Sequence, residues 1–232
     1  MAEQLFYKRG AKREERKKAT KELLSETWLF VCEGSKTEPN YIRSLVKHAN
    51  SMSSLRDLKI KVVGEGKSTR ALIKSVDDLL SEIDDVKRNN DIPFGKIFVL
   101  FDKDSFGEDD FDNAIKMATS RGYTPIWSNE CFELWYILHY EYLDADIGRE
   151  AYNKKLDKLL GIKNYKDHKS LDVFSIIYSP NRIKDALRNS ENLNNNSCHE
   201  SSNAKRVPCT QMHNLIQELE NRLKINLSNT TN

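Results

Sequence analysis

The sequence has 232 residues, of which 38% are hydrophobic and 31% charged. That length fits one sizeable domain, or one domain with a smaller appendage, and excludes a string of several small modules. The composition excludes a disordered or fibrous chain, and no run approaches the roughly 20 apolar residues of a membrane span. The 37 Lys and Arg against 35 Asp and Glu give a net charge of +2, too small for the whole surface to attract a polyanion.

Positive charge is concentrated at the N-terminus, where residues 1–22 contain eight Lys or Arg against four Glu. We expect residues 1–25 to form a basic arm that contacts phosphates through Arg13, Arg16 and Lys17. The alternative is a solvated helix in which Glu pairs with Lys or Arg three or four residues away. This N-terminus lacks the apolar stretch of a signal peptide, and the four cysteines form no CxxC pair. Both features favour a cytoplasmic protein with reduced thiols.

Strand and helix signals alternate over residues 27–141. The expected strands are apolar rather than strictly alternating, which is typical of a parallel sheet covered on both faces. The sequence therefore predicts an α/β domain with a parallel four-stranded sheet. The expected strands lie at 28–32, 58–63, 96–101 and 123–127, and the expected helices at 38–50 with Thr37 as N-cap, from 68 or 69 to about 86, at 111–121, and from a Ser128-Asn129 cap to 140.

The signals become helical beyond residue 145, at about 150–160, 180–189 and 210–224. The Asn- and Ser-rich stretch 189–203 is typical of a loop. The predicted organisation is thus a basic arm at 1–25, an α/β domain at 26–145 and a helical C-terminal extension at 146–232.

Acidic residues follow three of the predicted strands. Glu33 comes directly after the first strand, Asp102 and Asp104 follow the third, and Glu133 lies in the first turn of the helix after the fourth. Functional groups in parallel sheets gather beyond the carboxyl ends of the strands, where these acids would raise one another's pKa unless a cation lay between them. Oxygen ligands suit Mg²⁺ or Mn²⁺. Each acid alone is explained as a capping or surface carboxylate, but their joint placement favours a metal site.

Four segments carry a family resemblance. FVCEGSKTEPNYI (30–42), VLFDKD (99–104) and SNECFELW (128–135) resemble the RloB family, and VPCTQMHNL (207–215) is similar to its C-terminal motif. The resemblance covers nearly the whole chain. It departs at Glu130, where the family usually has Pro, and at Cys209, where it usually has Ser.

The resemblance implies a Toprim fold and the chemistry of nucleases of the OLD and abortive-infection type. It implies that Glu33 is a metal ligand or general acid/base, that Asp102 and Asp104 bind metal, and that Glu38 binds a second metal, although its spacing from Glu33 is one residue longer than in OLD enzymes. One-metal and two-metal sites both stay open. The implied activity is metal-dependent cleavage of DNA or RNA in bacterial antiviral defence, with an ABC-type ATPase as partner. A homo-oligomer is also left open.

Several basic residues and one histidine are weaker candidates. Lys36 and Lys103 lie beside the acids, and Lys67 and Arg70 open a helix whose N-terminus favours phosphate; the alternative for these two is a solvated helix start. His213 lies in the first turn of the last predicted helix, after Thr210 as its cap. If that turn faces the acids, His213 can donate a proton to a phosphate; otherwise it is a capping-turn residue.

Two other functions compete with a nuclease. Asp-x-Asp after a strand is also typical of haloacid dehalogenase phosphatases, but Phe106 occupies the position of their Thr or Val and the pair follows the third strand rather than the first. The second alternative is a non-catalytic module that binds nucleic acid or an ATPase. The presence of Glu33, Asp102 and Asp104 favours the nuclease. Nothing in the sequence distinguishes DNA from RNA, because metal and phosphate contacts do not read base edges.

Overall fold

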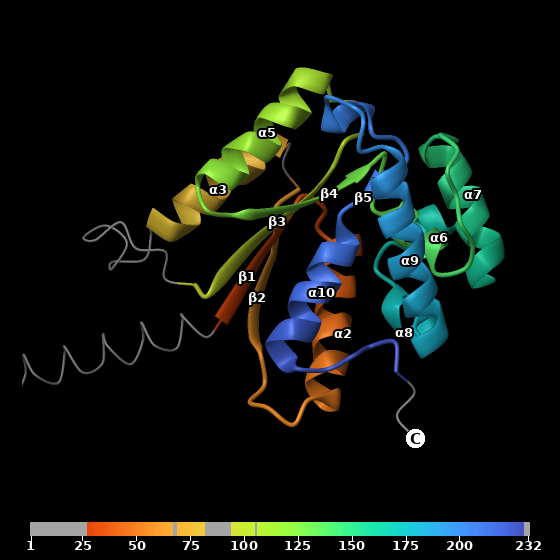
Figure 1. Cartoon of the computed structure of the whole chain (residues 1–232), viewed down its shortest axis with the longest axis horizontal. Coiled ribbons are helices and arrows are strands. Elements are labelled where there is room, and N and C mark those ends of the chain that lie inside the picture. The colour runs from red at the N-terminus through yellow and green to blue at the C-terminus, as the bar shows by residue number, and fades with distance from the viewer. Residues whose placement is uncertain (1–26, 67–68, 82–93, 105, 230–232) are drawn as a thin grey trace, which may run out of the picture.

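The computed structural model describes residues 27–66, 69–81, 94–104 and 106–229. The basic arm, with Arg13, Arg16 and Lys17, and also Lys67 lie outside these residues, so the expectations for them stay predictions. At the centre is a five-stranded sheet in the order β2-β1-β3-β4-β5 (Figure 1). The strands are β1 (Thr27–Cys32), β2 (Lys59–Gly64), β3 (Lys96–Asp102), β4 (Thr124–Asn129) and β5 (Cys209–Thr210).

The first four strands are parallel, as predicted, and β5 runs antiparallel to β4. The fold class α/β is therefore confirmed, but the prediction of a four-stranded, wholly parallel sheet is wrong. The added strand has two residues from the C-terminal motif. Two residues are too few to show the alternation of apolar and polar side chains that predicts a strand.

Helices cover both faces of the sheet. Figure 1 shows α3 and α5 on one face and α2, α10 and the remaining C-terminal helices on the other. The helices are α2 (Thr37–Met52), α3 (Thr69–Ser81), α5 (Glu108–Ser120), α6 (Glu133–Leu138), α7 (Arg149–Leu160), α8 (Val173–Ile177), α9 (Pro180–Asn196) and α10 (Met212–Leu223), with short 3-10 turns η1 (Tyr165–Asp167) and η2 (Asn203–Lys205). Within the described ranges, none of the helices has the length and apolar character needed to cross a membrane.

The apolar strands supply two hydrophobic cores. In β1, Phe30 points to the core under α2 and α10, whereas Leu29 and Val31 point to the core under α3 and α5. Successive side chains of a strand face opposite sides, so both faces of the sheet are buried. This explains why the strands read as continuous apolar runs.

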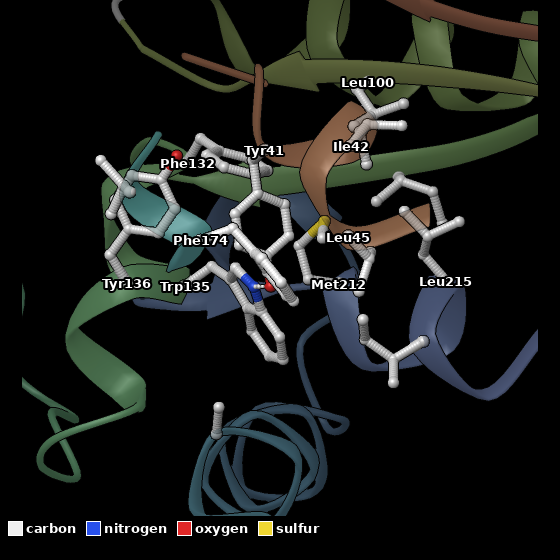
Figure 2. Packing of buried hydrophobic residues seen from close by; sticks show 14 of the residues in the cluster. Tyr41, Ile42, Leu45, Leu100, Phe132, Trp135, Tyr136, Phe174, Met212 and Leu215 are labelled. Carbon is white, nitrogen blue, oxygen red and sulfur yellow. Dashed lines mark hydrogen bonds between the residues drawn. The ribbon is translucent and has the colours of Figure 1, made fainter. Parts of the chain in front are cut away.

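The C-terminal helices share the first core with α2. Figure 2 shows Tyr41 and Leu45 of α2 packed among Trp135, Phe174 and Met212 from α6, α8 and α10. Trp135 Nε1 donates a 2.7 Å hydrogen bond to Tyr41 Oη. This packing fixes the position of α2, whose first turn enters the site described below.

Three predictions of local structure are wrong. Thr37 begins α2 and Lys36 is its N-cap residue, without a side-chain cap. Ser128 and Asn129 end β4 rather than capping α6, because Ser128 Oγ pairs with Thr210 Oγ1 of β5 at 2.9 Å. Thr210 itself lies in β5, so Gln211 is the N-cap residue of α10.

The Asn- and Ser-rich stretch 189–203 is also not a simple loop, because α9 continues to Asn196. Asn189 is buried and donates to the backbone oxygen of Leu138 at 2.9 Å, and Leu193 is buried in the first core. Tertiary packing therefore overrides the weak helix propensity of asparagine.

Candidate active site at the carboxyl ends of β1 and β3

A cavity of about 580 Å³ opens at the carboxyl ends of β1 and β3. Its walls come from the loops after these strands, the first turns of α2 and α6, one face of α7 and residues 166–170. All five acids predicted for the site line this cavity: Glu33, Glu38, Asp102, Asp104 and Glu133. Because functional groups gather beyond the carboxyl ends of parallel strands, the fold brings together residues that are up to 100 positions apart.

The loop after β1 is held by backbone hydrogen bonds on both sides. The N–H of Glu33 donates to the carbonyl of Leu100 at 2.9 Å, and its carbonyl accepts from Gly66 at 2.8 Å. The next residue, Gly34, donates its N–H to Glu38 Oε1 at 3.2 Å. A Cβ on Gly34 would lie 2.2 Å from Glu38 Oε2, so only glycine allows this approach.

The Asp-Lys-Asp segment after β3 is held by the end of β4. Lys103 N donates to Ser128 O at 2.8 Å and Asp104 N to Glu130 O at 3.1 Å. Asp104 has a left-handed backbone (φ +41), which Asp tolerates better than most residues. In this conformation the carboxylates of Asp102 and Asp104 reach the same partner, Arg149.

Glu133 is the first residue of α6 and is 3% exposed. It forms an ion pair with Lys169, whose ammonium lies 4.8 Å from the centroid of the Tyr165 ring. Burial alone would raise the pKa of Glu133, but Lys169 and its hydrogen bond lower that pKa below its ordinary value. Glu133 is therefore an ionised carboxylate whose charge is already balanced.

The other four acids have raised pKa values, although Arg149 offsets part of the shift at Glu33, Asp102 and Asp104. Burial raises the pKa of Glu33 to about 7, and Asp104 and Glu38 add to the shift by repulsion. Burial also raises the pKa values of Glu38, Asp102 and Asp104, and repulsion from Glu133 adds to each shift. Ionising these side chains costs free energy, which a cation in the cavity would reduce.

The possible metal ligands of the cavity are carboxylate oxygens, two of which contact Arg149. Within the described residues, no three Asp, Glu, His or Cys side chains are grouped closely enough to hold one ion as they stand. Arg149 lies between Asp102 and Asp104 instead. The donor set, carboxylate oxygens with raised pKa values, fits Mg²⁺ or Mn²⁺, provided that Arg149 moves away.

The predicted basic residues and His213 have different surroundings. Lys36 lines the cavity, and Lys103 donates to the backbone oxygen of Asp104 at 3.4 Å. Arg70 of α3 pairs with Asp110 of α5 at 2.9 Å, and both side chains are exposed. These two helices cover the face of the sheet away from α2 and α10 (Figure 1). His213 is buried, with Nδ1 2.9 Å from Ser190 Oγ of α9. Neither Arg70 nor His213 is among the residues that line the cavity.

The sequence analysis missed all six lining residues of the C-terminal segment: Arg149, Asn153, Lys166, Asp167, Lys169 and Ser170. They reach the cavity only because the C-terminal helices pack against α2 and α6. One signal was available, since Arg149 opens a helix, where the macrodipole disfavours a cation. A basic residue at such a position indicates an acidic partner elsewhere in the fold.

The mostly parallel sheet and the acids at its carboxyl edge define an α/β protein with an acidic cavity at the edge of its sheet. Within this class the chain belongs to the RloB family, since the family model described as RloB-like protein matches residues 28–219. No curated protein matches the chain. The same holds for solved structures, none of which matches.

Proposed function

We propose that this protein is a Toprim-type, metal-dependent nuclease that cleaves DNA or RNA in bacterial antiviral defence. The observation that carries the proposal is the convergence of Glu33, Glu38, Asp102, Asp104 and Glu133 in one cavity at the carboxyl edge of a parallel sheet. Membership of the RloB family supports it. An ABC-type ATPase partner and a cytoplasmic location belong to the same proposal.

The roles follow from the surroundings of each residue. Asp102, Asp104 and Glu33 would hold one Mg²⁺ or Mn²⁺, and Glu38 would contribute to a second. A bound ion of this kind supplies an activated water and stabilises the leaving oxygen of a phosphodiester. Without metal the pKa of Glu33 is about 7, so its carboxylate can accept a proton near neutral pH; a bound ion would lower this pKa and leave Glu33 as a ligand. Lys36 and Lys166 on the cavity wall are suited to contact substrate phosphates.

The test is cleavage by the purified full chain. Single- and double-stranded DNA, tRNA and messenger RNA are incubated with Mg²⁺ or Mn²⁺, first with the protein alone and then, where the neighbouring genes encode an ABC-type ATPase, with that ATPase added. Glu33→Gln is compared with Glu218→Gln, a matched variant of an exposed acid that pairs with Lys96. We expect the wild type and Glu218→Gln to cleave at least one substrate, and Glu33→Gln to lose that activity.

A non-catalytic binding module remains the second candidate, and one observation favours it. Arg149 and Lys169 neutralise part of the acidic cluster without a metal. If this reading is right, the protein binds nucleic acid or the ATPase with equal affinity in EDTA and in Mn²⁺. No substrate of the panel would then be cleaved, with or without the ATPase.

A further inference from the structure

A single nitrogen of Arg149 lies between two carboxylates of the cavity. Its Nη2 is 3.0 Å from Asp102 Oδ2 and 2.7 Å from Asp104 Oδ1. Asp102 and Asp104 are also the residues that would hold a divalent cation at this edge of the sheet. Arg149 and a cation would therefore compete for these two carboxylates.

The contact is not the two-nitrogen fork that makes Arg–carboxylate pairs strong, because one nitrogen serves both acids. The Arg149 side chain is 44% exposed and lines the cavity, and it also interacts with the Cys131 side chain. A contact of this kind can be broken without unpacking α7.

The face of α7 that carries Arg149 also carries Asn153, one helical turn further on, and both line the cavity. The side-chain oxygen of Asn153 is buried and has no hydrogen-bond partner. Lys166 and Lys169 line the same wall. The C-terminal segment thus supplies cations and an amide opposite the acids from β1 and β3.

We propose that Arg149 is a substrate-phosphate ligand that occupies the metal position until a divalent cation arrives. Asp102 and Asp104 would hold the cation, whose charge would repel the guanidinium. Arg149 then turns into the cavity and binds the nucleic-acid phosphate beside the metal. The second step rests on the proposed function, whereas the competition between Arg149 and the metal does not.

The first test is metal binding. Mn²⁺ is titrated into the wild type, Arg149→Gln and Arg188→Gln, and free Mn²⁺ is measured from its electron paramagnetic resonance signal. Arg188 is a matched control, because it is an exposed arginine paired with Asp185. We expect Arg149→Gln to bind Mn²⁺ at least about tenfold more tightly than the wild type, and Arg188→Gln to bind as the wild type does. Structural damage would weaken metal binding, so an increase in affinity is not explained by misfolding.

The second test is binding of labelled DNA and RNA oligonucleotides in Ca²⁺. Here we expect a loss of affinity rather than a gain. Arg149→Gln should bind the nucleic acid that the wild type binds best about tenfold more weakly than the wild type does. Unchanged or weaker Mn²⁺ affinity in Arg149→Gln would overturn the proposal, and so would unchanged oligonucleotide binding. A wild type that never cleaves would instead overturn the proposed nuclease function, while the Mn²⁺ titration would still decide whether Arg149 competes with metal.

Discussion

The backbone N–H of Asp102 donates a 3.1 Å hydrogen bond to Oε2 of Glu33. This bond joins the ends of two neighbouring parallel strands, β1 and β3, and directs the Glu33 side chain across the sheet edge toward the Asp-Lys-Asp segment. A glutamine side chain has an oxygen that can accept the same bond. Glu33→Gln therefore removes the charge and keeps the contact.

The first prediction concerns this variant. We expect Glu33→Gln to lower the cleavage rate by at least about 100-fold, the lower range for losing acid/base chemistry. Without metal it should unfold at a temperature no lower than the wild type, because the lost charge relieves repulsion from Asp104 and Glu38. Cleavage assays and melting curves in EDTA check the two parts. A folded Glu33→Gln protein that cleaves at the wild-type rate would place the reaction elsewhere.

Glu133→Gln should behave differently, because Glu133 is buried and paired with Lys169. The substitution leaves the Lys169 ammonium without its carboxylate, so we expect the free energy of unfolding to fall by about 1–3 kcal/mol. Urea denaturation measures the change. Glu33→Gln serves as the control, and equal stabilities of the two variants would contradict the structural role of the Glu133–Lys169 pair.

The pH dependence of stability follows from the raised pKa of Glu33. Its ordinary value of 4.5 applies to the unfolded chain, and the folded value is about 7. The unfolded chain thus releases this proton first as the pH rises. The contribution of Glu33 to stability is full below pH 4.5 and is lost as the pH rises through 7.

In EDTA, the wild type should therefore become progressively less stable relative to Glu33→Gln between pH 5 and pH 8. Urea denaturation of both proteins at several pH values gives the difference, and comparing the pair cancels the titration of other groups. A difference that stays constant over this range would show that Glu33 has an ordinary pKa.

Much of the fold could be predicted because parallel strands and amphipathic helices have local periods. The apolar run at Trp28 and the acids after β1 and β3 are such local signals. The acids then come together because the carboxyl ends of parallel strands meet at one edge of the sheet. The two-residue β5 was missed because its pairing with β4 is set by residues about 80 positions away. Asn194 was predicted to lie in a loop, yet it lies in α9, where its amide donates to the backbone oxygen of Thr210 at 2.9 Å.

The cationic half of the cavity could not be predicted for a related reason. Arg149 and Lys169 are ordinary basic residues in a charged segment, and their partners Asp102 and Glu133 are 47 and 36 positions away. Only the packing of the C-terminal helices on α2 and α6 brings them together. His213 shows the converse error, since its helix position was predicted correctly but its side chain faces Ser190 of α9.

Metal binding should stabilise the protein through Asp102 and Asp104. By mass action, an ion at about 100 times its dissociation constant adds about 2.7 kcal/mol to the free energy of unfolding. We expect saturating Mn²⁺ to raise the melting temperature of the wild type and to leave an Asp102→Ala/Asp104→Ala variant unchanged. An equal shift in both proteins would mean that Mn²⁺ binds at another place.

Gly34→Ala tests whether Glu38 acts from the position that the structure gives it. The new Cβ would lie 2.2 Å from Glu38 Oε2, and that oxygen is the far end of a flexible side chain. The carboxylate should therefore rotate away while the backbone stays in place. Since Gly34 lacks a positive φ, the substitution adds no backbone strain of the left-handed kind.

The matched control is Gly107→Ala, where the nearest atom is 3.9 Å away. If Glu38 contributes to metal binding, Gly34→Ala should weaken Mn²⁺ affinity and cleavage to the same extent as Glu38→Gln, with little change in melting temperature, and Gly107→Ala should match the wild type. Gly34→Ala with wild-type Mn²⁺ affinity would remove Glu38 from the metal site and leave Glu33, Asp102 and Asp104 as its ligands.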